Sequence, residues 1–160
     1  MPSQNDIDLQ WVVDDAPAVT TAQLADWVAA ALAVAATFDE ARTSGAVTVR
    51  VVDEDESGQL NEGFREKPGP TNVLAFPADS LLLGVGEDVE PELGDLVVCL
   101  PVVQREAGEQ NKAFEAHFTH MVVHGTLHLA GFDHIEDEDA LVMEALEVQA
   151  LQDLGIANPY

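Results

Sequence analysis

Three histidines in the last third of the sequence have a spacing suited to metal binding. His124, His128 and His134 form the pattern H-x3-H-x5-H, and Gly131 lies between the second and the third. On a helix, residues four apart project from the same face, so the rings of His124 and His128 can reach one point. A glycine permits the left-handed turn that ends a helix, which lets the chain fold back and bring His134 to that point. Three nitrogen ligands leave a tetrahedral ion one open position for water, so the pattern predicts a catalytic metal site.

Neutral imidazole binds zinc, copper, nickel or iron, so three histidines do not select the metal by themselves. We expect one zinc ion with three histidine ligands and a water, because this is a common hydrolytic site that needs no redox partner. Such an ion lowers the pKa of its bound water to about 7 and makes hydroxide available at neutral pH. The alternative interpretation is a helix whose histidines are ordinary core or surface residues.

The residue at position 125 limits which class of reaction the site can catalyse. Residues 124–134 match the zincin pattern H-E-x-x-H-x-x-G-x-x-H, except that Gly125 replaces the glutamate. That glutamate is the general base of the metalloproteases. Its absence therefore disfavours peptide hydrolysis.

Two further histidines, His117 and His120, precede the triad on the same predicted helix. At 100° per residue they lie near the face that carries His124 and His128. They either support the site, for instance by shuttling a proton, or are polar residues of a helix end near the surface. The spacing does not decide between these roles.

The charge of the chain limits where an anionic partner can bind. Thirty acidic residues against six basic ones give a net charge of −24, which repels nucleic acid on average. Among the basic residues only Arg65 and Lys67 are close in sequence. Arg65 is the candidate for binding phosphate, because a guanidinium binds phosphate oxygens bidentately and neutralises charge that develops in phosphoryl transfer. A surface salt bridge is its alternative role.

Length and composition indicate a single domain over residues 1–160. A hydrophobic content of 47% excludes a disordered chain, and the single cysteine, Cys99, excludes an intramolecular disulfide framework. We see no signal peptide and no apolar run of the roughly 20 residues that span a bilayer, so we expect a cytoplasmic protein without a membrane partner.

Alternation and capping signals predict the elements that position these residues. We expect strands at 7–13, 46–52, 71–76 and 96–100, a loop at 78–92, and helices at 21–38, 58–65, 102–112, 113–130 and 137–154. This order predicts an α+β domain with a mixed four-stranded sheet and about five helices, the histidine helix packed on the sheet. We expect Cys99 and Met143 in the core, and the acidic run 136–139 at the start of a solvated helix.

Four segments together resemble one known family. Residues 124–134, HGTLHLAGFDH, resemble the H-G-x-L-H-L-x-G-[YF]-D-H motif of the YbeY family, which consists of bacterial metal-dependent endoribonucleases. Leu60-Asn61 with Phe64-Arg65, the block 70–77 (PTNVLAFP) and Leu93-Gly94-Asp95-Leu96-Val97 are similar to further motifs of that family. Ala75 stands where the family usually has serine, and Phe132 where tyrosine is common.

The resemblance implies that His124, His128 and His134 are zinc ligands and that Arg65 is the catalytic or RNA-contacting arginine. It also implies maturation of the 3′ end of small-subunit ribosomal RNA and a role in ribosome quality control. RNA and the ribosome are then the expected partners, and DNA is not. A second hypothesis is a ribosome-assembly factor that binds basic ribosomal proteins through its acidic surface and whose metal is mainly structural.

Overall fold

Four strands pair into one mixed sheet with the spatial order β1-β2-β4-β3. The computed structural model describes residues 7–14, 17–37, 45–78, 92–132 and 137–160. The first three strands in this order, β1 (Ile7–Trp11), β2 (Ala46–Val52) and β4 (Glu92–Cys99), run parallel, and β3 (Val73–Pro77) is antiparallel to β4 at the edge. The mixed four-stranded sheet expected from the sequence is confirmed.

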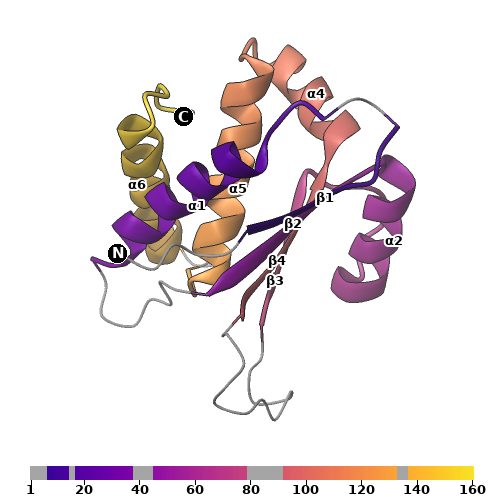
Figure 1. The fold of residues 1–160 in the computed structure, drawn as a ribbon, viewed down its shortest axis with the longest axis horizontal. Helices are drawn as coiled ribbons and strands as arrows, with labels where there is room; N and C mark the ends of the chain where they lie inside the picture. The colour runs from indigo at the N-terminus through magenta and orange to yellow at the C-terminus, as the bar shows by residue number, and fades with distance from the viewer. Residues whose placement is uncertain (1–6, 15–16, 38–44, 79–91, 133–136) are drawn as a thin grey trace.

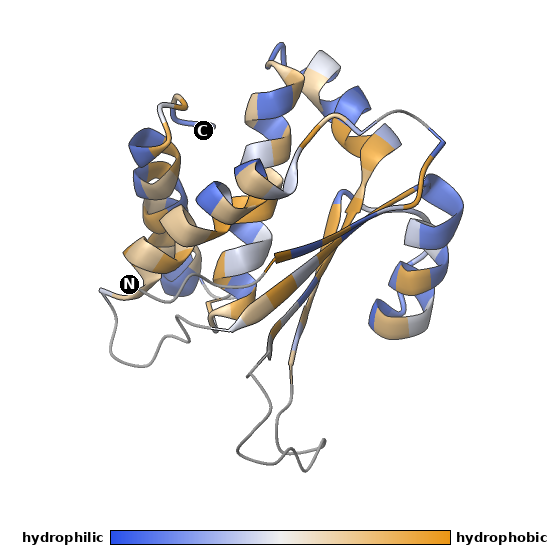
Figure 2. Cartoon of the chain, in the orientation of Figure 1, coloured by the Kyte–Doolittle hydropathy of each residue, from blue (hydrophilic) through white to orange (hydrophobic). Residues whose placement is uncertain are grey.

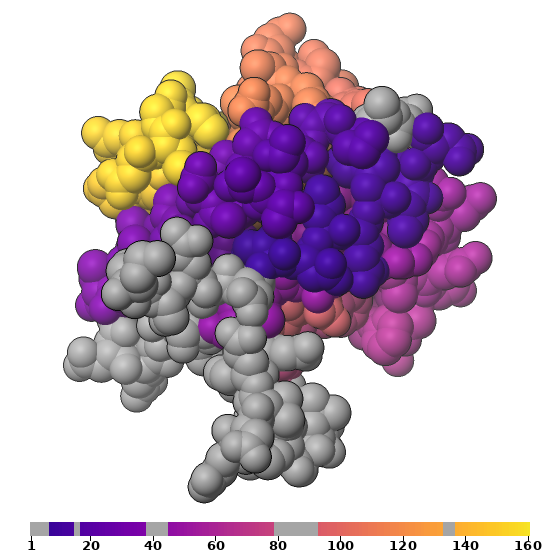
Figure 3. Space-filling model, in the orientation of Figure 1, coloured from indigo at the N-terminus to yellow at the C-terminus, as the bar shows by residue number. Residues whose placement is uncertain are grey.

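Helices cover the two faces of the sheet unequally (Figure 1). One face carries α1 (Thr21–Ala35), α5 (Phe114–Leu129) and α6 (Asp137–Asp153), and of the described helices α2 (Glu54–Arg65) covers the other. The fifth helix of the described residues, α4 (Leu100–Glu109), follows β4 directly. The space-filling view shows β1 and α1 across one side of the molecule, with α6 and α2 at its opposite ends (Figure 3). The α+β class and the packing of the histidine helix on the sheet are therefore as expected.

The main core lies between the sheet and the three-helix face. Strand β2 shows how the sequence builds it, because Val47, Val49 and Val51 are fully buried while Thr48 and Arg50, which point to the other face, remain half-exposed. A smaller apolar cluster that contains Cys99 lies under α2, a helix whose residues are largely hydrophilic with a few hydrophobic positions (Figure 2). Cys99 and Met143 are buried as expected. None of the helices in the described ranges is long and apolar enough to cross a membrane.

Helix α2 begins four residues earlier than the sequence predicted. Asp53 caps it by accepting a hydrogen bond from the Glu56 backbone N–H at 2.9 Å, and three acidic residues occupy its first turn. Carboxylates at a helix N-terminus interact favourably with the helix dipole and with its free N–H groups. Residues 53–56 thus cap and begin the helix, whereas the expected range 58–65 left them outside it.

The other predicted boundaries shift by a few residues. β3 includes Pro77, which an edge strand tolerates, and β4 begins at Glu92 because its pairing with β2 and β3 extends past the apolar run 96–100. α4 begins at Leu100, with Pro101 in its first turn. Of the loop expected at 78–92, residues 79–91 lie outside the described residues.

Gly94 allows β4 to approach β3 and the end of α5 closely. It follows the irregularity where the β2–β4 register shifts, its φ is +150°, and a Cβ there would collide with the carbonyl oxygen of Phe76 and approach Leu129 Cδ2 to 2.6 Å. A side chain at this position would push β4 away from β3 and from the end of α5.

We therefore expect Gly94→Ala to lower the free energy of unfolding by about 2–4 kcal/mol, from overpacking and backbone strain combined. Gly108→Ala is the control, since that glycine lies in the last turn of α4 with open space around it. There alanine adds helix propensity, at most about 1 kcal/mol. Urea unfolding of both variants measures the difference, and equal stabilities would contradict the close packing described at Gly94.

Candidate active site

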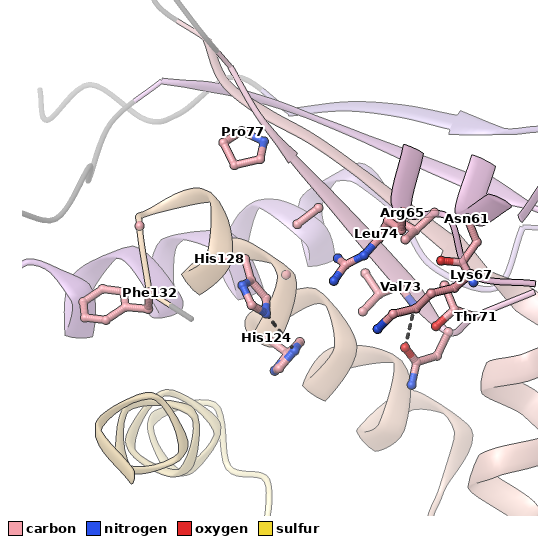
Figure 4. A pocket seen from close by; sticks show the side chains of 14 residues that line it. Asn61, Arg65, Lys67, Thr71, Val73, Leu74, Pro77, His124, His128 and Phe132 are labelled. Carbon is pink, nitrogen blue, oxygen red and sulfur yellow. Dashed lines mark hydrogen bonds between the residues drawn. The ribbon is translucent and has the colours of Figure 1, made fainter. Parts of the chain in front are cut away.

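A cavity of about 620 Å³ opens between α5, β3 and the end of α2. Figure 4 shows imidazoles on one wall and the Arg65 and Lys67 side chains reaching toward them from the α2 side. The site is thus formed by segments that are about 60 residues apart in the sequence. Its lining residues are Asn61, Arg65, Lys67, Thr71, Asn72, Val73, Leu74, Ala75, Pro77, His124, Gly125, His128, Gly131 and Phe132.

His124 and His128 are one turn apart on α5, as the spacing predicted. Their Nε2 atoms are 3.2 Å apart, and the ring planes are inclined at 78°. Two nitrogens that converge in this way beside a cavity form a donor set suited to a transition-metal ion. Gly131, with φ +110°, follows α5 in the left-handed conformation expected of it. His134 lies outside the described residues, so its position as a third ligand stays a prediction.

A buried carboxylate on α6 orients the first of these rings. Glu147 is 1% exposed, and its Oε1 lies 2.9 Å from His124 Nδ1. Because an ionised carboxylate only accepts hydrogen bonds, Nδ1 carries the hydrogen, and in the neutral ring Nε2 keeps its lone pair toward the cavity. A carboxylate that accepts from the far nitrogen of a ligating histidine is the usual support of a protein metal site. The donor set thus fits zinc at this wall.

The Glu147 carboxyl has three hydrogen-bonded neighbours. His120 Nε2 lies 2.9 Å from Oε1, and the Tyr160 hydroxyl donates to Oε2 at 2.7 Å. Burial by itself would raise the pKa of Glu147, but the hydrogen bonds from His120, His124 and Tyr160 outweigh it and lower that pKa to about 2. Glu147 is therefore a carboxylate at neutral pH. Burial and the hydrogen bond to this carboxylate raise the pKa of the Tyr160 hydroxyl, which stays protonated and donates.

His117 and His120 do not line the cavity, although both are buried. His117 Nε2 lies 2.9 Å from Glu106 Oε1, and the Glu106 carboxylate in turn accepts from Asn72 Nδ2 at 3.1 Å. Of the two roles left open by the sequence, a helix end near the surface is wrong. Their rings support carboxylates behind the site, and neither is placed to shuttle a proton to a substrate in the cavity.

Polar side chains of α2 hold the opposite wall. Ser57 accepts from the Thr71 backbone N–H at 3.0 Å, and Asn61 donates to the Gly69 carbonyl at 2.9 Å. Both side chains are buried, so these bonds fix the loop 66–72 against the helix. Glu66 ends α2 in a left-handed conformation with φ 57°. This turn places Arg65 and Lys67 on the same side of the cavity.

Arg65 thus shares a cavity with His124 and His128, as expected of a phosphate-binding arginine. The sequence interpretation missed Glu147. A signal was present, because Glu147 lies in the buried stripe of α6 formed by Met143, Ala150 and Leu151. A charged residue in such a stripe indicates a buried partner of opposite or hydrogen-bonding character.

Gly125 packs α5 against the sheet. A Cβ at this position would lie 2.7 Å from Leu96 Cδ2 and 3.3 Å from Val73 Cγ2, both buried or half-buried in the interface. The glutamate that zincins carry here would require the Leu96 side chain to shift. Glycine at this position lets α5 approach β3 and β4 without that shift.

Known proteins resemble the chain over nearly its whole length. Residues 12–155 match the family model described as Endoribonuclease YbeY. A protein of that name from Alcanivorax borkumensis is 46% identical over 155 residues, covering 96% of this chain and 85% of the relative. Another from Hydrogenovibrio crunogenus is 46% identical over 150 residues, covering 92% and 91%. The solution structure of a Thermotoga maritima protein is similar with a TM-score of 0.54 and 27% identity, covering 93% of this chain and 91% of that one.

Introducing the zincin glutamate tests the packing at Gly125. We expect Gly125→Glu to lower the free energy of unfolding by about 1–3 kcal/mol or more, because the larger side chain displaces Leu96. We expect no casein hydrolysis by this variant. Gly63→Glu adds the same side chain in open space on α2 and should leave thermal unfolding nearly unchanged. A stable, peptide-cleaving Gly125→Glu variant would contradict the packing argument.

Proposed function

The chain belongs to the YbeY family of endoribonucleases, and from that premise we propose that it cleaves single-stranded RNA at a zinc ion. We place this activity in the processing of ribosomal RNA in the cytoplasm, at the 3′ end of the small-subunit RNA and in ribosome quality control. The observation that carries the proposal is that the imidazoles of His124 and His128 and the side chain of Arg65 line the same cavity.

His124, His128 and His134 would hold the ion. Zinc bound there would supply Lewis acidity, which polarises a phosphoryl oxygen and acidifies a water molecule. Glu147 keeps His124 Nδ1 protonated and its Nε2 available, so the carboxylate fixes the ligand before any metal arrives. The low pKa of Glu147 means that this orientation persists over the whole physiological pH range.

Arg65 and Lys67 would bind the RNA backbone. A guanidinium that bridges two phosphate oxygens orients the phosphodiester and neutralises the charge that grows on it as the bond breaks. Lys67 adds a point charge on the same wall. A cavity of about 620 Å³ has the size of a site for a single small ligand and not for a duplex, which supports a preference for unpaired RNA.

The acidic exterior supports the ribosome as partner. A net charge of −24 leaves the outside of the protein suited to basic ribosomal proteins, while the cavity holds the two cations that suit RNA. The second candidate function, an assembly factor with a mainly structural metal, uses the same exterior. It differs in requiring no cleavage.

Two variants test the nuclease against the assembly factor. His128→Ala should lose most of the bound zinc and, with it, cleavage of a single-stranded RNA oligonucleotide. Arg65→Ala should keep the zinc and lose about 100- to 1,000-fold in the cleavage rate, the range for removal of one electrostatic stabiliser of a transition state. Zinc content is measured by atomic absorption and cleavage on denaturing gels, with the same oligonucleotide in a duplex for comparison.

Arg105→Ala is the control for the loss of an arginine. That side chain is 53% exposed on α4, pairs with Glu54 at 3.8 Å and does not line the cavity. It should retain zinc and cleavage. Cleavage that persists unchanged in Arg65→Ala would overturn the role of Arg65, and cleavage by zinc-free protein would overturn the role of the metal.

Lys67 is expected to act through charge alone. Each phosphate contact to single-stranded nucleic acid contributes about 0.7 to the slope of log K against log salt. Lys67→Ala should therefore change the slope of RNA binding by about 0.7 relative to the unaltered protein, with little change in the cleavage rate of bound RNA. Fluorescence anisotropy of a labelled oligonucleotide between low and moderate salt measures the slope, and an unchanged slope would place Lys67 off the RNA path.

A further inference from the structure

The segment that follows α6 returns to the back of the histidine helix. Lys112 Nζ donates to the Pro159 carbonyl at 3.2 Å, and Ile156 packs against the main core. The segment covers a small cavity of about 220 Å³, one wall of which is His120. Tyr160, although 63% exposed, sets its ring edge-on to His120 with centroids 5.7 Å apart. These contacts bring its hydroxyl to a buried carboxylate.

Both oxygens of Glu147 accept hydrogen bonds, and the donors to the two oxygens come from different segments of the chain. Oε1 accepts from His120 and His124, which belong to the same helix, α5. Oε2 accepts from the Tyr160 hydroxyl at 2.7 Å. The last torsion of a glutamate side chain is broad, and rotation about it moves both oxygens together, so the hydrogen bonds to the carboxylate decide its value. The Tyr160 hydroxyl adds a restraint on Oε2 to the two that α5 places on Oε1.

We propose that Tyr160 is a positioning residue of the metal site, which holds the Glu147 carboxylate in the rotation that aims His124 Nε2 into the cavity. The inference rests on the proposed zinc site and adds to it a residue that does not line the cavity. The chain of contacts runs from the Tyr160 hydroxyl through both oxygens of Glu147 to His124 Nδ1, with each separation between 2.7 and 2.9 Å.

The Tyr160→Phe variant tests the hydroxyl separately from the ring. Tyr160→Phe keeps the ring against His120 and removes only the bond to Oε2. Partners that support a metal ligand from behind are worth about 10- to 100-fold in metal affinity, so we expect a zinc affinity about tenfold weaker for this variant. The affinity is measured by competition with a chromophoric chelator, without any activity assay.

Thr119→Val is the matched control. Its hydroxyl donates to the Glu115 carbonyl at 2.6 Å on the helix that carries the ligands, and no hydrogen bond of the described residues joins it to Glu147. Removing this buried hydroxyl should cost stability of the zinc-free protein and leave the zinc affinity unchanged. A merely structural role of Tyr160 would give the same pattern, with a lower unfolding temperature and an unaltered zinc affinity.

The sequence contains one tyrosine, which provides a direct probe. Protein labelled with 3-fluorotyrosine has a single ¹⁹F resonance from the phenol at position 160. We expect this resonance to shift when zinc is added to the labelled protein, and to respond far less in a Glu147→Gln background.

The outcomes separate the inference from the proposed function. Zinc binding with equal affinity in the unaltered protein and in Tyr160→Phe, with an unmoved resonance, overturns the role of Tyr160 and leaves the zinc site intact. No zinc binding by the unaltered protein overturns the metal site itself, and the inference with it.

Discussion

A single buried carboxylate joins the parts of this protein that the site requires. Glu147 comes from α6, and its hydrogen-bonded neighbours come from α5 and from the segment after α6. Burying an unpaired carboxylate is strongly unfavourable, so α6 can dock on α5 only where these donors are already in place. The packing of α6 on α5 and the orientation of the His124 ring are therefore coupled. A packing of the two helices that misdirected His124 would leave this carboxylate short of one of its donors.

The rest of the site depends on close packing at two glycines and on hydrogen bonds that hold a loop. Gly125 lets α5 approach β3 and β4, and Gly94 lets β4 approach β3 and the end of α5. Buried Ser57 and Asn61 then hold the loop 66–72 against α2. As a result, Arg65 at the end of α2 and the imidazoles of α5 line one cavity beside the edge strand β3. Among the strands of the described residues, β3 is the last in the order, so none of them pairs with its outer edge.

The sequence patterns predicted the features that depend on neighbouring residues along the chain. Alternating valines identified β2, the four-residue spacing placed His124 and His128 on one face, and glycine ended α5 in a left-handed turn. The beginning of α2 was placed four residues late because its acidic first turn was left outside the expected range 58–65. The meeting of Arg65 with the histidines could be inferred only from family resemblance, since 59 to 63 residues separate them in the sequence. Glu147 was missed because its burial is intelligible only with partners from another helix.

The contrast between the two cations in the cavity and the 30 acidic residues of the chain has a kinetic consequence. Charges of either sign act out to about a Debye length, about 8 Å at physiological salt, and over that range the acidic residues far outnumber Arg65 and Lys67. Encounters with freely diffusing RNA are therefore slowed, the reverse of the steering seen in basic nucleases. A strand already held in place by a larger assembly does not face that barrier. The acidic surface thus disfavours freely diffusing RNA relative to RNA that is already held beside the cavity, whatever the RNA sequence.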